Sequence, residues 1–288
     1  MRRLKKGGIL VMLAVLMGTA TISCSYSNGS MSNGTIDTGN LHFVEADLTE
    51  KPFTKIEVET IADVYYVQNN GDQQSVRFDF THIKDDKLRK QFEDKAVAIY
   101  REGKLKIGLK SKITGVSKLD SGSRMRVYIT SPDLVKITLE GIGTFHSDAI
   151  NSDVFDIDNE GVGNIEIKNL LANRVGIDNE GVGSVTVLRL QSDDVNIDNE
   201  GVGNVKIGHF KGGRLKIDNE GVGKVEAQVD CKSIHAMIEG VGNIKLSGTT
   251  NSLTKEKDGV GRYQISDLKI GKPQIRNRPH KMTQRSKR

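Results

Sequence analysis

Carboxylates that recur every 20 residues are the side chains whose types and spacing best suit chemistry. They form an aspartate column and, two positions later, a glutamate column: Asp158, Asp178, Asp198 and Asp218, followed by Glu160, Glu180, Glu200 and Glu220. Both columns have the same parity, so on strands they would face solvent as one acidic strip. Carboxylate oxygens suit Ca²⁺, and the strip is a candidate calcium site; no other metal or cofactor is expected. Alternatively, the carboxylates fan outward or accept hydrogen bonds from nearby glycine amides.

Catalysis would need an acid–base pair that differs from its neighbours in the repeat. Here the acids are the repeating element itself. The histidines are scattered, with no Ser or Cys context typical of a triad: His42, His82, His146, His209, His235 and His280. We therefore predict no catalytic residue and no enzyme activity.

The elements that carry these columns come from an internal repeat. The tetrapeptide Glu/Asp-Gly-Val/Ile-Gly begins at Glu140, Glu160, Glu180, Glu200, Glu220, Glu239 and Asp258. Around it, apolar residues recur at every second position, which is strand periodicity. The paired glycines mark a corner in each copy: Gly141, Gly143, Gly161, Gly163, Gly181, Gly183, Gly201, Gly203, Gly221, Gly223, Gly240 and Gly242. Each repeat is predicted to contain two or three short strands.

Stacking explains why the unit repeats, because a 20-residue unit without a helix cannot bury its own apolar face. We predict an all-β fold, a parallel β-solenoid of about seven 20-residue rungs, with equivalent residues about 4.8 Å apart. A right-handed coil is expected for parallel crossovers. The rival is an antiparallel meander in which each repeat is one hairpin. Identical side chains at a fixed period favour the solenoid.

An asparagine column lies directly before the glutamates. Asn159, Asn179, Asn199 and Asn219 share the inward parity of the isoleucine column. Buried amides need hydrogen-bond partners, and a ladder in which each amide donates to the next carbonyl would supply them. We expect a structural role for this ladder.

Residues 52–135 contain further alternating runs without the 20-residue signature. Strands are predicted at 55–60, 64–68, 75–80, 95–109 with a break at Glu102-Gly103, and 125–130, and residues 85–93 look helical or irregular. These atypical strands would cover the apolar end of the first rung, an edge that an uncapped solenoid leaves open. We predict one β domain over residues 52–268, with regular repeats from residue 136.

The N-terminus predicts export and a lipid anchor. Residues 1–23 have a basic start, an apolar run from Ile9 to Met17 and small residues, as in a signal peptide. The stretch Thr21-Ile22-Ser23-Cys24 resembles a bacterial lipobox, so Cys24 is expected to be acylated and to hold the protein on a membrane. The alternative is ordinary cleavage near Ala20, which leaves Cys24 a free thiol. Residues 24–51 are predicted to form a flexible tether.

The distribution of charged residues indicates which classes of partner the protein can bind. Twelve of the 42 Lys and Arg lie in the first six and last twenty residues, whereas all 37 Asp and Glu lie between Asp37 and Asp267. The body is therefore acidic, which argues against nucleic-acid binding. Residues 269–288 are predicted to be a disordered basic tail. That tail would contact anionic lipid or polysaccharide, fold back on the acidic strip, or stay solvated.

The chain resembles the putative auto-transporter adhesin family with a head GIN domain over about residues 52–265. The resemblance rests on the residue runs 52–56, 103–107 and 127–134 and on the Gly-x-Gly corners. It implies an exported, often lipid-anchored β-helical protein of Gram-negative envelopes, and adhesion by analogy.

Three functions are compatible with these features. The first is a non-catalytic envelope lipoprotein, in the outer membrane, whose solenoid binds an unidentified protein or polysaccharide as an adhesin does. The second is a periplasmic scaffold without an external ligand. The third and most remote is a polysaccharide-acting enzyme, because parallel β-helices also host such enzymes. Neither the ligand nor the oligomeric state follows from the sequence.

Overall fold

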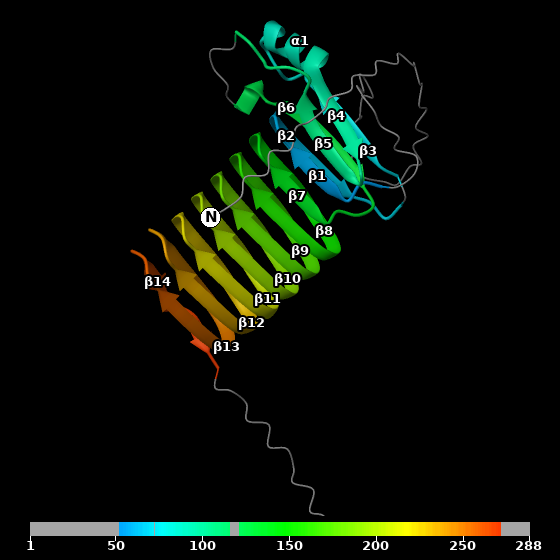
Figure 1. The fold of residues 1–288 in the computed structure, drawn as a ribbon. Helices are drawn as coiled ribbons and strands as arrows, with labels where there is room; N and C mark the ends of the chain where they lie inside the picture. The colour runs from blue at the N-terminus through cyan, green and yellow to red at the C-terminus, as the bar shows by residue number, and fades with distance from the viewer. Residues whose placement is uncertain (1–51, 72, 116–120, 272–288) are drawn as a thin grey trace, which may run out of the picture. The chain divides into compact units, whose positions relative to one another are not determined.

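The repeats stack as the rungs of a parallel β-solenoid in the computed structural model, which describes residues 52–71, 73–115 and 121–271. Figure 1 shows the long strands lying side by side in chain order. Their bounds are β8 Ile142–Asn159, β9 Val162–Asn179, β10 Val182–Asn199, β11 Val202–Asn219, β12 Val222–Ile238 and β13 Asn243–Lys257. Neighbouring rungs pair in register, with Ile177 opposite Ile157 and Ile197. The predicted solenoid is confirmed, and the antiparallel meander is wrong.

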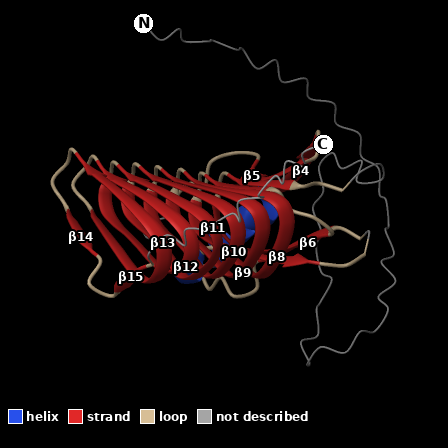
Figure 2. Cartoon of the chain, turned by 90° about the horizontal axis from the view of Figure 1, so that it is seen from below, coloured by secondary structure: helices blue, strands red, loops and turns tan. Residues whose placement is uncertain are grey.

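Each rung is one long bent strand, whereas the alternation predicts two or three short ones. The strands β8 to β11 each run for 18 residues and break only at the Glu-Gly corner. Figure 2 shows the strands curving around the inside of the solenoid. The strand continues through its bends because each rung pairs with an equivalent rung that bends at the same place.

Aliphatic columns fill the inside of the solenoid. Ile157, Ile177, Ile197 and Ile217 are at most 2% exposed, and Phe145, Ile165, Val185, Val205 and Val225 are fully buried. Burying one such aliphatic side chain contributes about 1.5–3 kcal/mol relative to leaving it in water. Hydrophobic burial in repeated columns is therefore the main stabilising term of the rungs.

The corners need glycine because successive rungs approach too closely for a side chain. A Cβ added to Gly201 would lie 2.2 Å from the carbonyl oxygen of Gly181 in the preceding rung. The corner amides are already used, since Gly181 N–H donates to the Asn159 carbonyl at 2.7 Å and Glu180 N–H to the same oxygen at 3.0 Å. The glycine amides therefore bond to backbone of the previous rung and not to glutamate carboxylates, so that expected relief of the acidic strip is wrong.

The first rungs do not follow chain order. Strands β1 (Lys55–Val58) and β2 (Ile61–Gln68) form one rung, and β5 (Lys104–Leu109) and β6 (Met125–Ser131) form another. The β1 strand pairs in parallel with both β5 and β7 (Lys136–Leu139), while β2 pairs with both β6 and β8. The rung that comes first in the chain is thus inserted between two rungs that come later.

Two antiparallel strands and a helix close the N-terminal end, whereas the other strands predicted to cover it, β1, β2, β5 and β6, are themselves rungs. Strand β3 (Ser75–Asp79) pairs with β6, and β4 (Ala96–Arg101) pairs with β5. A short 3-10 turn spans Ser121–Ser123. The helix α1 (Asp86–Lys95) begins at Asp85, whose carboxylate accepts a hydrogen bond from the Leu88 amide, and it buries Leu88 and Phe92. Figure 1 shows α1 beyond the end of the rungs.

At the other end, β14 (Arg262–Gln264) and β15 (Leu268–Ile270) both pair with β13. The Tyr263 hydroxyl donates to the Ala236 carbonyl oxygen at 2.8 Å. Residues 269–271, assigned to the tail by sequence, therefore belong to the β domain. The predicted signal, Cys24 and tether, together with the tail from residue 272, lie outside the described residues. In the described part of the chain, no helix is long and apolar enough to cross a membrane.

Candidate functional site

The asparagine column forms a continuous amide ladder inside the solenoid. Nδ2 of Asn159 donates to Oδ1 of Asn179, and the same bond joins Asn179 to Asn199 and Asn199 to Asn219, each at 2.7 Å. All four residues are 0% exposed. The ladder ends where Leu139 and Ile238 continue the column, which leaves Oδ1 of Asn159 and Nδ2 of Asn219 without a partner. The asparagine side chains bond to one another and are shielded from solvent, so the ladder offers no accessible ligand site.

The aspartate column points outward, as its parity predicts, but it is not freely exposed. The glutamates at the corners are exposed, whereas Asp158, Asp178 and Asp198 are half-buried and Asp218 is 8% exposed. The expectation that the aspartates lie in open solvent is therefore wrong. The side chains of neighbouring rungs stack against one another along the sheet and exclude water from the aspartate row.

Asp178 differs from the other three aspartates in its neighbours. Asp158 pairs with Lys136, Asp198 accepts from Nδ2 of Asn196 at 2.6 Å, and Asp218 pairs with Lys216 at 2.5 Å. The residue two positions before Asp178 is Gly176, which offers no side chain, and Oδ1 of Asp178, like that of Asp218, is buried without a partner.

The pKa of Asp178 is raised well above that of an ordinary aspartate. Burial, reinforced by the charges of Glu180, Asp158 and Asp198, raises the pKa of Asp178 to about 6. Burial also raises the pKa of Asp198. Asp178 and Asp198 therefore hold a proton more readily than an ordinary aspartate does.

The strip does not converge on a metal site. Within the described ranges, the one group of three carboxylates close enough to share an ion is Glu57, Glu59 and Glu140, and none of these belongs to the strip. Lys104 and Lys106 already pair with Glu57 at 2.5 and 3.3 Å. Calcium binding by the strip therefore stays a prediction that no convergent geometry supports.

A row of exposed aliphatic side chains runs beside the corner glutamates. Its members are 38–75% exposed: Ile142, Val162, Val182, Val202, Val222, Val241 and Val260. Sequence reasoning treated these valines only as part of the corner motif. Their position two residues after the Glu gives them the same outward parity, which is the signal that identifies the row.

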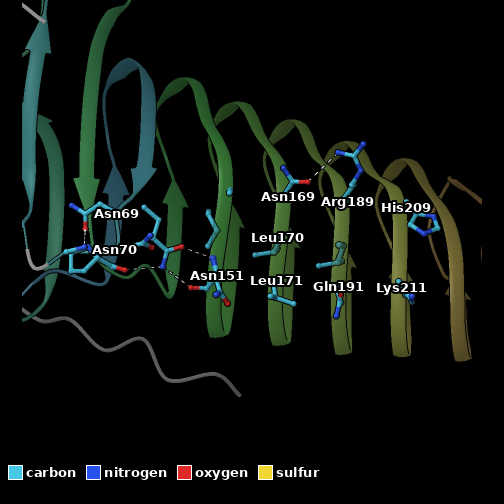
Figure 3. Close-up of a pocket in the computed structure, with 16 residues that line it drawn as sticks. Asn69, Asn70, Asn151, Asn169, Leu170, Leu171, Arg189, Gln191, His209 and Lys211 are labelled. Carbon is cyan, nitrogen blue, oxygen red and sulfur yellow. Dashed lines mark hydrogen bonds between the residues drawn. The ribbon is translucent and has the colours of Figure 1, made fainter. Parts of the chain in front are cut away.

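A groove of about 770 Å³ crosses four rungs on a face away from the corners. Its two outward rows come from equivalent positions of β8 to β11: Asn151, Leu171, Gln191 and Lys211 in one row, and Asn169, Arg189 and His209 in the other. Figure 3 shows these rows, with Asn69 and Asn70 at the N-terminal end. Ile150, Leu170 and Leu190 also line the groove and are buried.

Hydrogen bonds fix the N-terminal wall of the groove. Gln68 at the end of β2 donates from Nε2 to the carbonyls of Asn151 (2.8 Å) and Pro132 (3.1 Å), and its Oε1 accepts from the Asn151 amide at 2.7 Å. The Asn69 side chain holds its own loop by donating to the Gln73 carbonyl at 2.6 Å and accepting from the Gly71 amide. These hydrogen bonds within the protein therefore preform the N-terminal wall of the groove.

The described residues that line the groove include no Asp or Glu, in a protein whose folded body is acidic. Arg189, His209 and Lys211 are all exposed there. Nη1 of Arg189 donates to Oδ1 of Asn169 at 3.4 Å. The described lining therefore offers hydrogen-bond donors and positive charge.

The groove was not predicted from the sequence, because its columns do not consist of identical residues. The groove columns lie nine and eleven positions after the corner Glu, and their residue types change from rung to rung. Variation on an outward column, within an otherwise near-identical repeat, is the signal that would have pointed to them. The histidines are scattered as expected: His82 contacts the Arg124 carbonyl, His146 stacks on Tyr65, and His209 lines the groove.

The comparison with known proteins concerns the whole β domain. The model of the family described as putative auto-transporter adhesin, head GIN domain, matches residues 52–229 and 195–278. A crystal structure of a putative adhesin from Bacteroides fragilis NCTC 9343 is 26% identical, with a TM-score of 0.64, and the match covers 74% of this chain and 92% of that one. A putative adhesin from Parabacteroides merdae ATCC 43184 is 17% identical over the same shares, with a TM-score of 0.44. No curated protein matches the chain.

Proposed function

Because the chain belongs to the putative auto-transporter adhesin, head GIN domain family, we propose that it is an exported, adhesin-like binding protein anchored in the cell envelope by a lipid on Cys24. The solenoid supplies a rigid surface, and the tether of residues 24–51 lets that surface stand off the outer membrane. The ligand is a protein or polysaccharide, and no nucleic acid, metal or cofactor takes part.

The observation that carries this proposal is the groove across β8 to β11. Its volume of about 770 Å³ lies in the range of ligand-binding clefts. Its outward residues vary in type, while the buried columns beneath them repeat. A surface that varies on a constant scaffold is the arrangement of a binding protein whose framework and recognition residues are separate.

A non-catalytic role is supported by the chemistry of the same groove. Among the described residues, the side chains that line it are polar and basic and include no pair of carboxylates of the kind that glycoside hydrolysis uses. Incubation of the purified protein with acidic polysaccharides is expected to release no new reducing ends and no unsaturated products. Turnover that a single groove substitution abolishes would replace this proposal with the enzyme alternative.

The experiment that tests the location is labelling of intact cells with a membrane-impermeant amine reagent, compared with labelling after lysis. We expect the protein to be labelled on intact cells, as an adhesin requires. Protection until lysis would favour the second candidate, a periplasmic scaffold. The Cys24→Ser variant is the matched control for the anchor and is expected to leave the membrane fraction while keeping the same fold. Retention of that variant on the membrane would contradict anchoring at Cys24.

A further inference from the structure

We infer that the groove across β8 to β11 binds a linear acidic oligosaccharide that lies along the solenoid axis. The inference rests on the proposed function, because it names the ligand class of that binding surface. Four features of the groove carry it: its charge, its free amides, its exposed leucine and the spacing of its rows.

The positive charge of the groove favours an anionic ligand. Among the described residues, neither Arg189 nor Lys211 has a carboxylate within 4 Å, whereas Arg214, three positions after Lys211 and outside the groove lining, pairs with Asp194 at 2.6 Å. An exposed guanidinium without an acidic partner is free to form a bidentate contact with a carboxylate or sulfate. In the next rung, Asp230 stands opposite Lys211 and limits the basic area to a small patch. The patch fits one acidic group better than a long polyanion.

The side-chain amides that are not hydrogen-bonded within the protein favour a ligand with hydroxyl groups. In the described part of the chain, the side chains of Asn70, Asn151 and Gln191 make no hydrogen bond, although all three are exposed on the groove. Each amide offers two donors and one acceptor, and neighbouring sugar hydroxyls can use both kinds at once. The rigid wall made by Gln68 lowers the entropy lost on binding.

The exposed leucine supplies the apolar part. Leu171 is 45% exposed in the row between Asn151 and Gln191, above the buried Leu170 and Leu190. Sugar rings have one polar rim and apolar C–H faces, so a single aliphatic contact between amides suits a ring. The described residues of the lining include no Phe, Tyr or Trp, the side chains on which single-stranded nucleic acid stacks.

The spacing of the rows sets the direction of the ligand. Equivalent side chains of successive rungs lie about 4.8 Å apart, so Asn151, Leu171, Gln191 and Lys211 form a line about 14 Å long. Figure 3 shows this line running from the loop at Asn69 toward Lys211. The units of a linear polysaccharide repeat on a similar scale. Neutral units would lie over the amides, and the acidic group would reach Arg189 and Lys211.

The test is calorimetric titration of the full-length protein in detergent with a fixed panel of probes. The acidic probes are tetragalacturonate, a hyaluronate tetrasaccharide and 3′-sialyllactose, and the neutral ones are fully methyl-esterified tetragalacturonate and cellotetraose. We expect at least one acidic probe to bind, and its affinity to fall at least tenfold in the double variant Arg189→Gln, Lys211→Gln, which corresponds to about 1.4 kcal/mol or more. The double variant Arg174→Gln, Lys206→Gln removes the same charge away from the groove and is expected to bind as the wild type does.

Three results would overturn the inference: no acidic probe binds, methyl esterification leaves the affinity unchanged, or the two double variants lose affinity equally. An oligoglutamate peptide that binds as tightly as the acidic oligosaccharides would show that the groove recognises negative charge alone. That result would also contradict the inference. Arg189 and Lys211 are exposed, so unchanged thermal midpoints of the variants will show that both still fold. Failure of this test leaves the proposed function standing if intact cells are still labelled, whereas protection of the protein in intact cells overturns the proposed function alone.

Discussion

Nδ2 of Asn179 donates to Oδ1 of Asn199 at 2.7 Å, and this bond is one step of a ladder that is fully shielded from water. Each inner asparagine donates once and accepts once, while each end has one unpaired atom. An inner and an end asparagine therefore differ in what their loss leaves behind.

Asn179→Leu is expected to destabilise the protein far more than Asn159→Leu. Replacing Asn179 leaves Oδ1 of Asn199 newly unpaired, at a cost of about 1–3 kcal/mol for a buried group, and leaves Nδ2 of Asn159 with only its long 3.4 Å bond to the Gly163 carbonyl. Replacing Asn159 only moves the unpaired carbonyl to Asn179, and Leu139 shows that leucine fits the column. Denaturant unfolding of both variants measures the difference. Equal losses would show that the ladder does not set the energetics of this column.

Gly201→Ala is expected to lower the free energy of unfolding by about 2–3 kcal/mol or more, because the new Cβ would lie 2.2 Å from the backbone oxygen of Gly181. Gly108→Ala is the matched control, since no atom lies within 4 Å of its Cβ position. Thermal unfolding of the two variants compares them. If Gly201→Ala were as stable as Gly108→Ala, the close approach of the rungs at the corner would be wrong.

Protonation of Asp178 is expected to contribute stability to the solenoid as the pH falls from about 7 toward 4. The pKa of Asp178 is about 6 in the folded protein, because of burial and the charges of Glu180, Asp158 and Asp198, against an ordinary value of 3.8. Between these values the folded state binds a proton that the unfolded chain does not, so this contribution is fully present below pH 4 and is lost as the pH rises through 6.

Asp178→Asn removes the charge, and it is expected to raise the thermal midpoint at pH 7.5 by about 2–4 °C and to have a clearly smaller effect at pH 4.5. Asp218→Asn is the control, because its carboxylate pairs with Lys216 at 2.5 Å and its loss should bring no gain at pH 7.5. An equal effect of Asp178→Asn at both pH values would contradict the raised pKa.

The thiol of Cys231 is expected to react with a thiol reagent at least tenfold more slowly in the folded protein than in guanidinium. Cys231 is 7% exposed, its Sγ lies 3.5 Å from Oγ1 of Thr250, and burial raises its pKa. The chain has two cysteines, so protein extracted from membranes should titrate as one thiol after unfolding if Cys24 carries its acyl thioether. A second thiol would show that Cys24 is unmodified.

The regular rungs were predictable because their information is local and repeated. Alternation around Ile157 and Ile177 identifies the inward face, and the constant spacing sets the register in which Asn159 meets Asn179. The runs before the repeats were also located correctly, and the segment 85–93 became most of α1 (Asp86–Lys95). Each of these features is encoded in a stretch of sequence no longer than one rung.

The order of the first rungs could not be read in this way. Val58 pairs with Ile107 on one side and Leu139 on the other, although both partners lie far along the chain. All three strands have the same alternation, so the pattern identifies strands without choosing their neighbours. The choice depends on how β3, β4 and α1 close the end of the solenoid.

The sequence by itself determined a stacked β-solenoid, its register and its amide ladder, because identical residues at a fixed period pair best with their own copies. The tertiary structure decided the half-burial of the aspartates and the insertion of β1 and β2 between later rungs. It also decided the groove, where Gln68 and Asn151 meet across 83 residues. Such features arise where residues distant in the chain pack together, and no local periodicity encodes them.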